Sequence, residues 1–413
     1  MSFYDDLCSD AEWDRFLEYR TGNGLRSERE NAELEKFVGK RLYRGITEKI
    51  RSGEYAFPAP RKKSVSKTGT DKRRTVYSFG RRENTVLKMA AFLLHRYDGI
   101  FPDNLYSYRQ DLGVKEAVRR LTLVKDLGRK YCYKADIHDY FNSVDTGILL
   151  PELKGAVEPD EYRLISGILL NPYVRSGKET AREEKKGIMA GLPISAFLAN
   201  FYLMGMDRHF SDLGIFYARY ADDIIVLADT PEELQEYREC IHSYLKGRKL
   251  EINPRKEHVY SPGDTIEFLG FGICGRRIDL ADATVRKTKA KIRRAARSIT
   301  RWGNRKSIDR TVRMEVMIRK FARIFYGAEN GELSWEYWYF PTLNTADGLR
   351  IVDGYLQERV RWIGTGRSST KNRGEVPYSL LKEMGYVPLV HAYYERRKGL
   401  IPVDVPEDRR EDA

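Results

Sequence analysis

Two adjacent carboxylates, Asp222 and Asp223, stand between two apolar runs at residues 215–217 and 224–227. Apolar, β-branched and aromatic residues on both sides of a short polar break are typical of a β-hairpin, so we expect both carboxylates at its tip. Neighbouring like charges are costly unless a positive charge neutralises them. Two divalent metal ions about 3.5–4 Å apart would do so and could drive an in-line phosphoryl displacement. An acidic surface turn is the alternative for so short a motif.

A third carboxylate, Asp136, ends the segment 131–136, which reads as a short strand. Mg²⁺ prefers one or two carboxylates together with phosphate oxygens and water, so an acid from a second strand beside the hairpin would complete a two-metal set. Asp139, Asp145 and Asp229 fall outside the expected strand-end positions, and we expect them to be solvated or to cap helices.

Further blocks of sequence accompany these acids in a fixed order. They are Lys72–Val76, Asn104–Arg109, Asp136–Phe141, Gly187–Leu203, Tyr220–Asp223, Leu250–Lys256 and Phe268–Phe271. Over roughly residues 55–275 this order resembles the reverse transcriptase family. The resemblance implies an α+β fold: a right-hand polymerase with fingers, a palm whose antiparallel sheet carries the Asp-Asp hairpin, and a helical thumb. It also implies an RNA-directed DNA polymerase that uses two Mg²⁺ ions, for which Mn²⁺ can substitute.

The resemblance assigns roles to residues at the predicted catalytic centre. Asp136, Asp222 and Asp223, with Ile137, would bind the metal ions, and Lys256 would lie near the leaving pyrophosphate as a charge partner or proton donor. The nucleotide-binding set would be Lys63, Lys72, Arg74, Tyr140, Phe141, Gly191 and Pro193.

Phe141 would be the bulky ring beneath the sugar that excludes a 2′-OH and so favours dNTPs, although a core phenylalanine is the alternative. Phe268, Leu269 and Gly270 would form the primer grip, a tight turn against the primer backbone.

Positive charge is concentrated in residues 286–323, which contain fifteen Lys or Arg and two acids. The excess of thirteen positive charges in this segment equals the net charge of +13 of the whole chain. The pattern is helical, with Val285, Ile292, Ala296 and Ile299 on one face. So dense a run of one sign favours a phosphate-binding surface over a merely solvated face. By resemblance this is the thumb, and its expected nucleic-acid contacts are Arg286, Lys289, Arg293, Arg297 and Arg301.

The predicted organisation has four parts. Residues 1–55 form a helical extension. Residues 56–135 form the fingers and the start of the palm, and the fingers include a basic hairpin near 61–74. Residues 136–275 form the palm, with a fingers insertion near 146–186. Residues 276–413 form a basic helical thumb and C-terminal extension, in which we expect the aromatic residues at 335–339 to pack in a core rather than stack on RNA bases.

Other features limit the function classes. No apolar run is long enough to span a membrane, no signal peptide is recognisable, and the four cysteines form no C-x-x-C pair. We therefore expect a cytoplasmic protein without zinc or disulfides. No constellation typical of RNase H or an HNH nuclease is present, so a domesticated enzyme is favoured over a mobile element.

Three positions depart from the family pattern. Ala190 stands where many members have Gln, and Leu192 and Ala196 differ from the commonest group II intron-like form. These differences move the chain away from mobile-intron maturases and towards unclassified bacterial reverse transcriptases, many of them active in phage defence. We expect a monomeric ribonucleoprotein that binds a dedicated structured RNA, an RNA/DNA duplex and dNTPs. The alternatives are a retron-type enzyme, a maturase-like RNA-binding protein and an RNA-dependent RNA polymerase. The absence of a Val-Thr-Gly triplet from the C-terminal third disfavours the retron-type enzyme. Phe141 disfavours the RNA polymerase.

Overall fold

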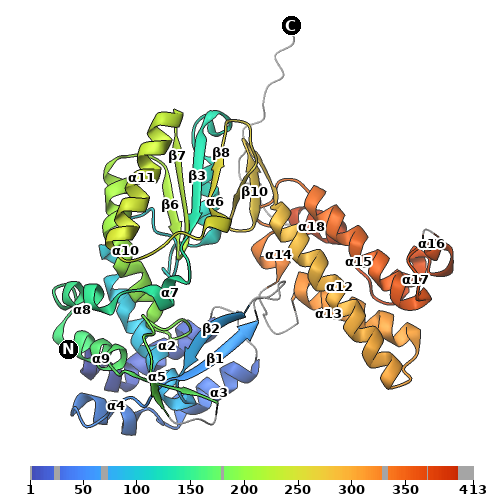
Figure 1. The fold of residues 1–413 in the computed structure, drawn as a ribbon. Helices are drawn as coiled ribbons and strands as arrows, with labels where there is room; N and C mark the ends of the chain where they lie inside the picture. Colours follow the sequence, from blue (N-terminus) through green and yellow to red (C-terminus); the bar gives the residue numbers. More distant parts are fainter. Residues whose placement is uncertain are drawn as a thin grey trace. The chain divides into compact units, whose positions relative to one another are not determined.

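The computed structural model describes residues 2–22, 28–66, 73–177, 181–327, 334–369 and 371–398. The chain divides into two compact units. The first contains Met1–Leu269 and Cys274–Arg276, and the second contains Gly270–Ile273 and Arg277–Ala413. Helices and strands occur in both, which confirms the α+β fold class (Figure 1). None of the described helices combines the length and apolar character needed to cross a bilayer.

The first unit contains two sheets and most of the helices. Its helices are α1 (Phe3–Cys8), α2 (Asp10–Gly22), α3 (Glu28–Gly39), α4 (Arg44–Arg51), α5 (Arg81–Leu93), α6 (Val114–Thr122), α7 (Tyr140–Ser143), α8 (Thr146–Lys154), α9 (Pro159–Leu169), α10 (Ser195–Asp212) and α11 (Pro231–Gly247), with the 3₁₀ helices η1 (Leu94–Ile100), η2 (Leu127–Arg129) and η3 (Pro254–Lys256). Its strands are β1 (Arg61–Ser66), β2 (Arg73–Ser78), β3 (Tyr131–Asp136), β4 (Tyr173–Ser176), β5 (Arg182–Glu183), β6 (Tyr217–Tyr220), β7 (Asp223–Ala228), β8 (His258–Tyr260) and β9 (Ile266–Phe268). The helices expected within residues 1–55 are α1 to α4.

One antiparallel sheet carries the predicted carboxylates, in the strand order β6-β7-β3-β8. Helix α11 packs on β3 and β7, and α10 packs against β6 (Figure 1). On β3, the hydroxyl of Tyr133 lies 3.1 Å from Nε2 of His242 on α11. Because successive residues of a strand face opposite sides, Lys134 and Asp136 face away from α11. The sheet therefore has one face packed on helices and another that presents the acids.

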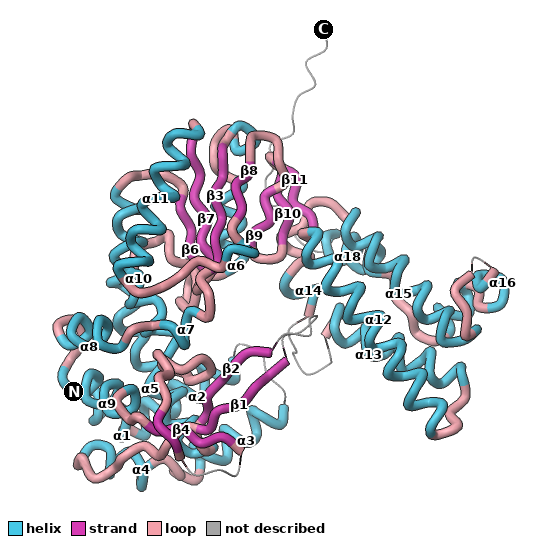
Figure 2. Tube along the Cα trace, viewed as in Figure 1, coloured by secondary structure: helices cyan, strands magenta, loops and turns pink. Residues whose placement is uncertain are grey.

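The other sheet of this unit has the order β2-β1-β4-β5. Its strands β1, β2 and β4 are labelled in Figure 2. β1 pairs antiparallel with β2 and parallel with β4. The two arms β1 and β2 correspond to the basic hairpin expected near residues 61–74. The residues that join these arms, including Lys72, lie outside the described residues.

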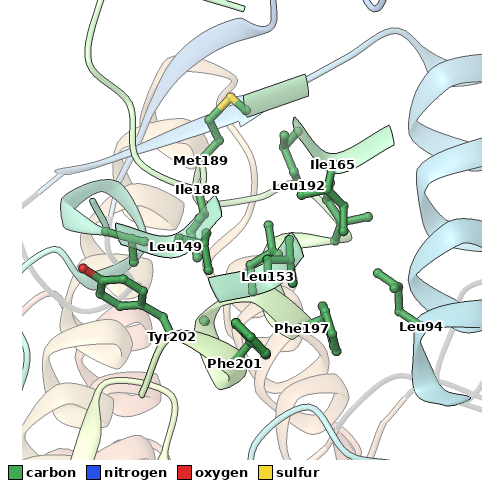
Figure 3. Close-up of a cluster of buried hydrophobic side chains, with 14 of the residues drawn as sticks. Leu94, Leu149, Leu153, Ile165, Ile188, Met189, Leu192, Phe197, Phe201 and Tyr202 are labelled. Carbon is green, nitrogen blue, oxygen red and sulfur yellow. The ribbon is translucent and has the colours of Figure 1, made fainter. Parts of the chain in front are cut away.

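A buried apolar cluster anchors the loop between residues 187 and 194 (Figure 3). Ile188, Met189 and Leu192 from this loop are all buried in it. The cluster also contains Leu149 and Leu153 of α8 and Ile165 of α9, and Phe197, Phe201 and Tyr202 of α10. Burying three apolar side chains of a short loop fixes its backbone, which explains how a Gly-containing segment can hold one conformation.

The second unit is mainly helical. It contains α12 (Asp282–Arg305), α13 (Arg310–Tyr326), α14 (Trp335–Trp338), α15 (Asp347–Thr365), α16 (Asn372–Glu375), α17 (Tyr378–Glu383) and α18 (Leu389–Lys398), and the strands β10 (Phe271–Cys274) and β11 (Arg277–Leu280). Helices α12, α13 and α15 pack on one another. The predicted apolar face of α12 is confirmed, since Val285, Ile292, Ala296 and Ile299 are all buried.

The aromatic residues near the start of α14 mostly pack within this unit, as predicted. The Trp335 ring lies 5.0 Å from the rings of both Phe325 and Tyr339, centroid to centroid. Tyr337 is an exception with 44% of its surface exposed.

Candidate active site

Strand pairing places the three predicted carboxylates together. Asp136 and Asp223 are Cα partners in the antiparallel β3–β7 register, and such opposite residues have Cβ atoms about 4.5–5.5 Å apart. Asp222 lies in the two-residue turn between β6 and β7, which Tyr220 and Asp223 close as partners. The N–H of Ile137 donates to the carbonyl of Asp222 at 2.9 Å. The predicted hairpin and the predicted strand end at Asp136 are therefore both confirmed.

The site holds more negative charge than its protein neighbours neutralise. Burial, and then the charge of Asp136, raises the pKa of Asp222 from 3.8 to about 6. Burial also raises the pKa of Asp223, against the opposing charge of Lys134. Oδ1 of Asp223 is buried and receives no hydrogen bond of ordinary geometry, although Nζ of Lys134 forms an ion pair with it at 3.3 Å. This electrostatic state favours the binding of a cation.

Two lysines stand closest to the carboxylates. Lys134 precedes Asp136 by two positions on β3 and so shares its face of the sheet. Lys256, at the end of η3, contacts Oδ2 of Asp136 through Nζ, and its side chain is 52% exposed. Lys256 is thus held at the carboxylate cluster, and its contact with a leaving pyrophosphate stays a prediction.

The carboxylates fit part of a magnesium coordination sphere. Within the part of the chain that the structure describes, no group of three or more His, Cys, Asp or Glu side chains has the geometry to hold a metal ion. The paired Asp136 and Asp223, and the buried oxygen of Asp223, match the one or two carboxylates that Mg²⁺ takes when phosphates and water supply its other ligands. The role of Ile137 as a metal ligand stays a prediction.

An aromatic group borders the carboxylates. Phe141 lies on α7, is partly buried, and meets the ring of Tyr108 edge to face with centroids 6.2 Å apart. The Tyr108 ring also lies 6.4 Å from that of Tyr220, which precedes the turn that holds Asp222. Tyr108 is 42% exposed and has a φ of +56°, unusual for a bulky residue. Phe141 is therefore connected through Tyr108 to the residue that precedes the Asp222 turn, while its selection between sugars stays a prediction.

The loop around Gly191 needs glycine for two reasons. Its φ is +101°, and a Cβ built there would lie 2.9 Å from the carbonyl oxygen of Tyr77 on β2. The N–H of Tyr77 donates to the carbonyl of Ala190 at 2.7 Å, so the loop is joined to β2. Pro193 lines a cavity of about 220 Å³ together with Tyr108. The loop thus lies between β2 and the aromatic group.

Two residues with predicted contacts, Tyr140 and Phe268, have buried side chains, so any contact that they make would come from the backbone, and both contacts stay predictions. Tyr140 was expected to contact nucleotide, but it is 2% exposed and its hydroxyl donates to the carbonyl of Ala199 at 2.5 Å. Phe268 was expected to contact the primer, but it is fully buried at the end of β9. The expected tight turn is present, with φ of +49° at Leu269 and +91° at Gly270. Any primer contact there would involve the turn and not the Phe268 ring.

Lys63 and Arg74 are exposed on β1 and β2. Lys63 pairs with Val76 across the hairpin, and Arg74 lies close enough to Tyr108 for an electrostatic interaction. The charge of Arg74 therefore acts on Tyr108, and nucleotide binding by both residues stays a prediction.

Four of the five basic residues expected on α12 form one exposed stripe. Arg286, Arg293, Arg297 and Arg301 are all exposed, and their spacing of seven, four and four residues puts them on one face. The fifth, Lys289, is partly buried, with Nζ 5.0 Å from the ring centroid of Tyr355 in a cation–π contact, and its contact with nucleic acid stays a prediction. The stripe can follow a line of phosphates, whereas Lys289 is engaged within the second unit.

Sequence reasoning missed three residues around the carboxylates. The period of two in β3 could have placed Lys134 beside Asp136, whereas no sequence signal gives the backbone of Tyr108. The third, Arg219, is fully buried directly before Tyr220. Its signal was a lone charge inside an apolar strand, for which a buried partner is required.

Comparison with known families identifies the chain. Residues 62–273, about half of it, match the family described as reverse transcriptase (RNA-dependent DNA polymerase). The chain belongs to this family, in agreement with the predicted right-hand polymerase fold. The match contains the three carboxylates, Phe141 and the Gly191 loop, and it extends from β1 to β10.

Individual relatives are more distant. Retron Ec86 reverse transcriptase from Escherichia coli is 23% identical over 171 residues, covering 40% of this chain and 49% of that protein. The chain thus spans about half the length of this curated relative. A structure of apo telomerase from Candida tropicalis, truncated from the C-terminal domain, is similar with a TM-score of 0.41 and 13% identity over 55% of each chain. Telomerase from Candida albicans with a fragment of telomeric RNA gives a TM-score of 0.43 and 11% identity over 89% of this chain and 71% of that one.

Proposed function

We propose that this protein is an RNA-directed DNA polymerase that uses two-metal catalysis at Asp136, Asp222 and Asp223. The observation that carries the proposal is the pairing of Asp136 with Asp223 across β3 and β7, directly beside the turn that holds Asp222. These residues lie within a chain segment that belongs to the reverse transcriptase family.

The residues around the three carboxylates favour the binding of a cation. Bound Mg²⁺ would supply a Lewis acid that activates the primer hydroxyl and stabilises the leaving pyrophosphate. Asp136, Asp222 and Asp223 would hold it, with the carbonyl of Ile137 as a further ligand. Burial and the charge of Asp136 disfavour the ionised form of Asp222, and Oδ1 of Asp223 receives no hydrogen bond in the described part of the chain, so a bound cation would relieve the repulsion. Lys134 and Lys256 compensate part of the charge before the cation binds.

Nucleotide selection would depend on the residues around the carboxylates. Phe141 would pack beneath the sugar and exclude a 2′-OH, with the edge of Tyr108 holding its ring. Lys63, Lys72 and Arg74 of the β1–β2 hairpin would bind the triphosphate. The rigid Gly191–Pro193 loop would let the backbone approach the base pair closely. In this organisation β1 and β2 belong to the fingers and the β6-β7-β3-β8 sheet is the palm.

The second unit would hold the template–primer duplex. The exposed stripe of α12 offers guanidinium groups to successive phosphates, a contact that is independent of sequence and sensitive to salt. A helix with an apolar face packed on α13 and α15 and a basic face left exposed is suited to this use.

The template is expected to be a dedicated structured RNA, in a ribonucleoprotein that acts in anti-phage defence. The sequence match to a retron reverse transcriptase and the departure at Ala190 from the intron-like pattern support this role. Plating a broad phage panel on cells that carry the gene and its flanking DNA, with and without Asp222→Asn, tests it. We expect protection that requires Asp222, and equal plating for all strains would remove the defence role while leaving the polymerase in place.

The polymerase proposal is tested by dNTP incorporation as a function of Mg²⁺ or Mn²⁺. We expect Asp223→Asn to abolish incorporation at every metal concentration without loss of fold. A matched control is Asp229→Asn, which removes a carboxylate that is 71% exposed. Among the described residues, Lys130 is the one residue that forms an ion pair with Asp229. Full activity of a folded Asp223→Asn protein would contradict the two-metal assignment.

A further inference from the structure

The turn that presents the catalytic carboxylates depends on a strained residue. Ala221, which immediately precedes Asp222, has a φ of +57° and is 4% exposed. Residues other than Gly, Asn and Asp rarely adopt this conformation, so the surroundings must enforce it at Ala221.

Side chains from two other segments hold both peptide groups of Ala221. Its N–H donates to Oγ of Ser107 at 2.9 Å. Its carbonyl accepts a hydrogen bond from Nη1 of Arg219 at 3.2 Å. The next carbonyl, that of Asp222, is held by the N–H of Ile137 at 2.9 Å. Three backbone groups of the turn are therefore held by residues outside it.

Arg219 is itself held by a buried carboxylate on α10. Nε donates to Oδ1 of Asp207 at 2.7 Å and Nη2 to Oδ2 at 2.5 Å, a bidentate pair in which both side chains are fully buried. The hydroxyl of Tyr217 donates to Oδ1 of Asp207 at 3.0 Å. The guanidinium cannot reorient without breaking this pair, so it holds the Ala221 carbonyl in a fixed place.

Asn200 of α10 connects the two restraints. Its carbonyl accepts from Nη2 of Arg219 at 3.1 Å, and its Oδ1 accepts from the hydroxyl of Ser107 at 3.0 Å. Its Nδ2 donates to the carbonyl of Ser107 at 2.8 Å. The hydrogen bonds form a closed network around the turn, and every member is buried.

We propose that Ser107 and the Arg219–Asp207 pair are positioning residues that hold Ala221 in its left-handed conformation and thereby place Asp222 and Asp223 against Asp136 for metal binding. This role rests on the proposed function, since it assigns the network to the metal affinity of those carboxylates. A buried ion pair adds little net stability compared with apolar residues of the same size, which favours a geometric role over a purely stabilising one.

The test uses Mn²⁺ binding to the purified full chain, followed by the electron paramagnetic resonance signal of free Mn²⁺. Ser107→Ala removes the acceptor of the Ala221 N–H, and Arg219→Lys keeps the charge but removes the fork that reaches the Ala221 carbonyl. Each should weaken Mn²⁺ binding by about tenfold or more, the loss typical when a partner that orients the metal ligands from the outer shell is removed. In primer extension, kcat should fall while KM for dNTP stays unchanged.

Thr47→Val is the matched control, because it removes a buried hydroxyl on α4 in the same unit. Among the described contacts, this hydroxyl donates only to the carbonyls of Tyr43 and Arg44, at the start of its own helix. It should leave Mn²⁺ affinity at the wild-type value. If wild-type Mn²⁺ binding requires Asp223, and both Ser107→Ala and Arg219→Lys keep the wild-type Mn²⁺ affinity and kcat, the positioning role is overturned. Absence of a cooperative melting transition in both variants would also overturn it, by assigning the network to folding. Wild-type and Asp223→Asn proteins that bind Mn²⁺ equally would refute the proposed function itself.

Discussion

Replacing Asp222 by Asn should stabilise the metal-free protein while abolishing DNA synthesis. The native environment raises the pKa of Asp222 from 3.8 to about 6, with burial as the largest cause and Asp136 as the next. A raised carboxyl pKa means that the folded state disfavours the charged form. One pKa unit corresponds to about 1.36 kcal/mol, so the charge costs the folded state about 3 kcal/mol at neutral pH. Asn has the same shape and no charge, and it removes this cost.

The raised pKa of Asp222 also predicts how the stability of the wild type changes with pH. Between pH 3.8 and about 6 the native protein binds more protons at Asp222 than the unfolded chain does, so the stability of the wild type should fall as pH rises through this window. Below pH 3.8 both states are protonated and the cost vanishes. The stability gain of Asp222→Asn should therefore be largest near a pH of about 7.5 and fall to about half at a pH of about 5.

Urea denaturation of both proteins in EDTA measures this difference as a free energy of unfolding. Asp229→Asn serves as a control for the removal of one surface carboxylate and should change stability by less than about 0.5 kcal/mol. Adding saturating Mg²⁺ should stabilise the wild type and leave Asp222→Asn nearly unchanged, because a ligand stabilises only the state that binds it. An Asn variant that is equally or less stable than the wild type at neutral pH would refute the claim that this site stores uncompensated negative charge.

Three further outcomes are expected. Phe141→Ala should raise the ratio of kcat/KM for rNTPs to that for dNTPs, and an unchanged ratio would return Phe141 to a packing role. Replacing Arg293, Arg297 and Arg301 by Gln should weaken duplex binding and reduce the slope of log K against log salt by about 0.9 for each phosphate that the protein no longer neutralises; an unchanged slope would remove α12 as the phosphate surface. Gly191→Ala should destabilise the protein by about 1–3 kcal/mol and impair extension, because the new Cβ would lie 2.9 Å from the Tyr77 carbonyl at a φ of +101°; wild-type melting would contradict this.

The hairpin that carries Asp222 and Asp223 could be predicted because its signals are local. Apolar residues flank Asp222 and Asp223 within a few positions, and the alternation of β3 stops at Asp136. A period of two and a short polar break are enough to define strands and their ends. The basic face of α12 could also be predicted, since a helical period of 3.6 separates its apolar and charged stripes without knowledge of its partners.

Other features depend on packing between distant segments. Tyr140 and Phe141 are neighbours, and only the placement of α7 against α10 decides that Tyr140 is buried. The partners Asp207 and Arg219 are separated by a helix end and a loop, so their pairing requires α10 to lie on β6. The contact of Lys289 with Tyr355 joins α12 to α15 in the same way. Sequence patterns give the face of an element but not the residue opposite it.

Extension of a DNA primer on a defined RNA template by the purified protein tests the central claim most directly. With Mg²⁺ and dNTPs, we predict a product whose sequence is complementary to the RNA, and no product from folded Asp222→Asn protein under the same conditions. A wild-type protein that adds no nucleotides, or a product that persists in Asp222→Asn, would contradict an RNA-directed DNA polymerase built on Asp136, Asp222 and Asp223.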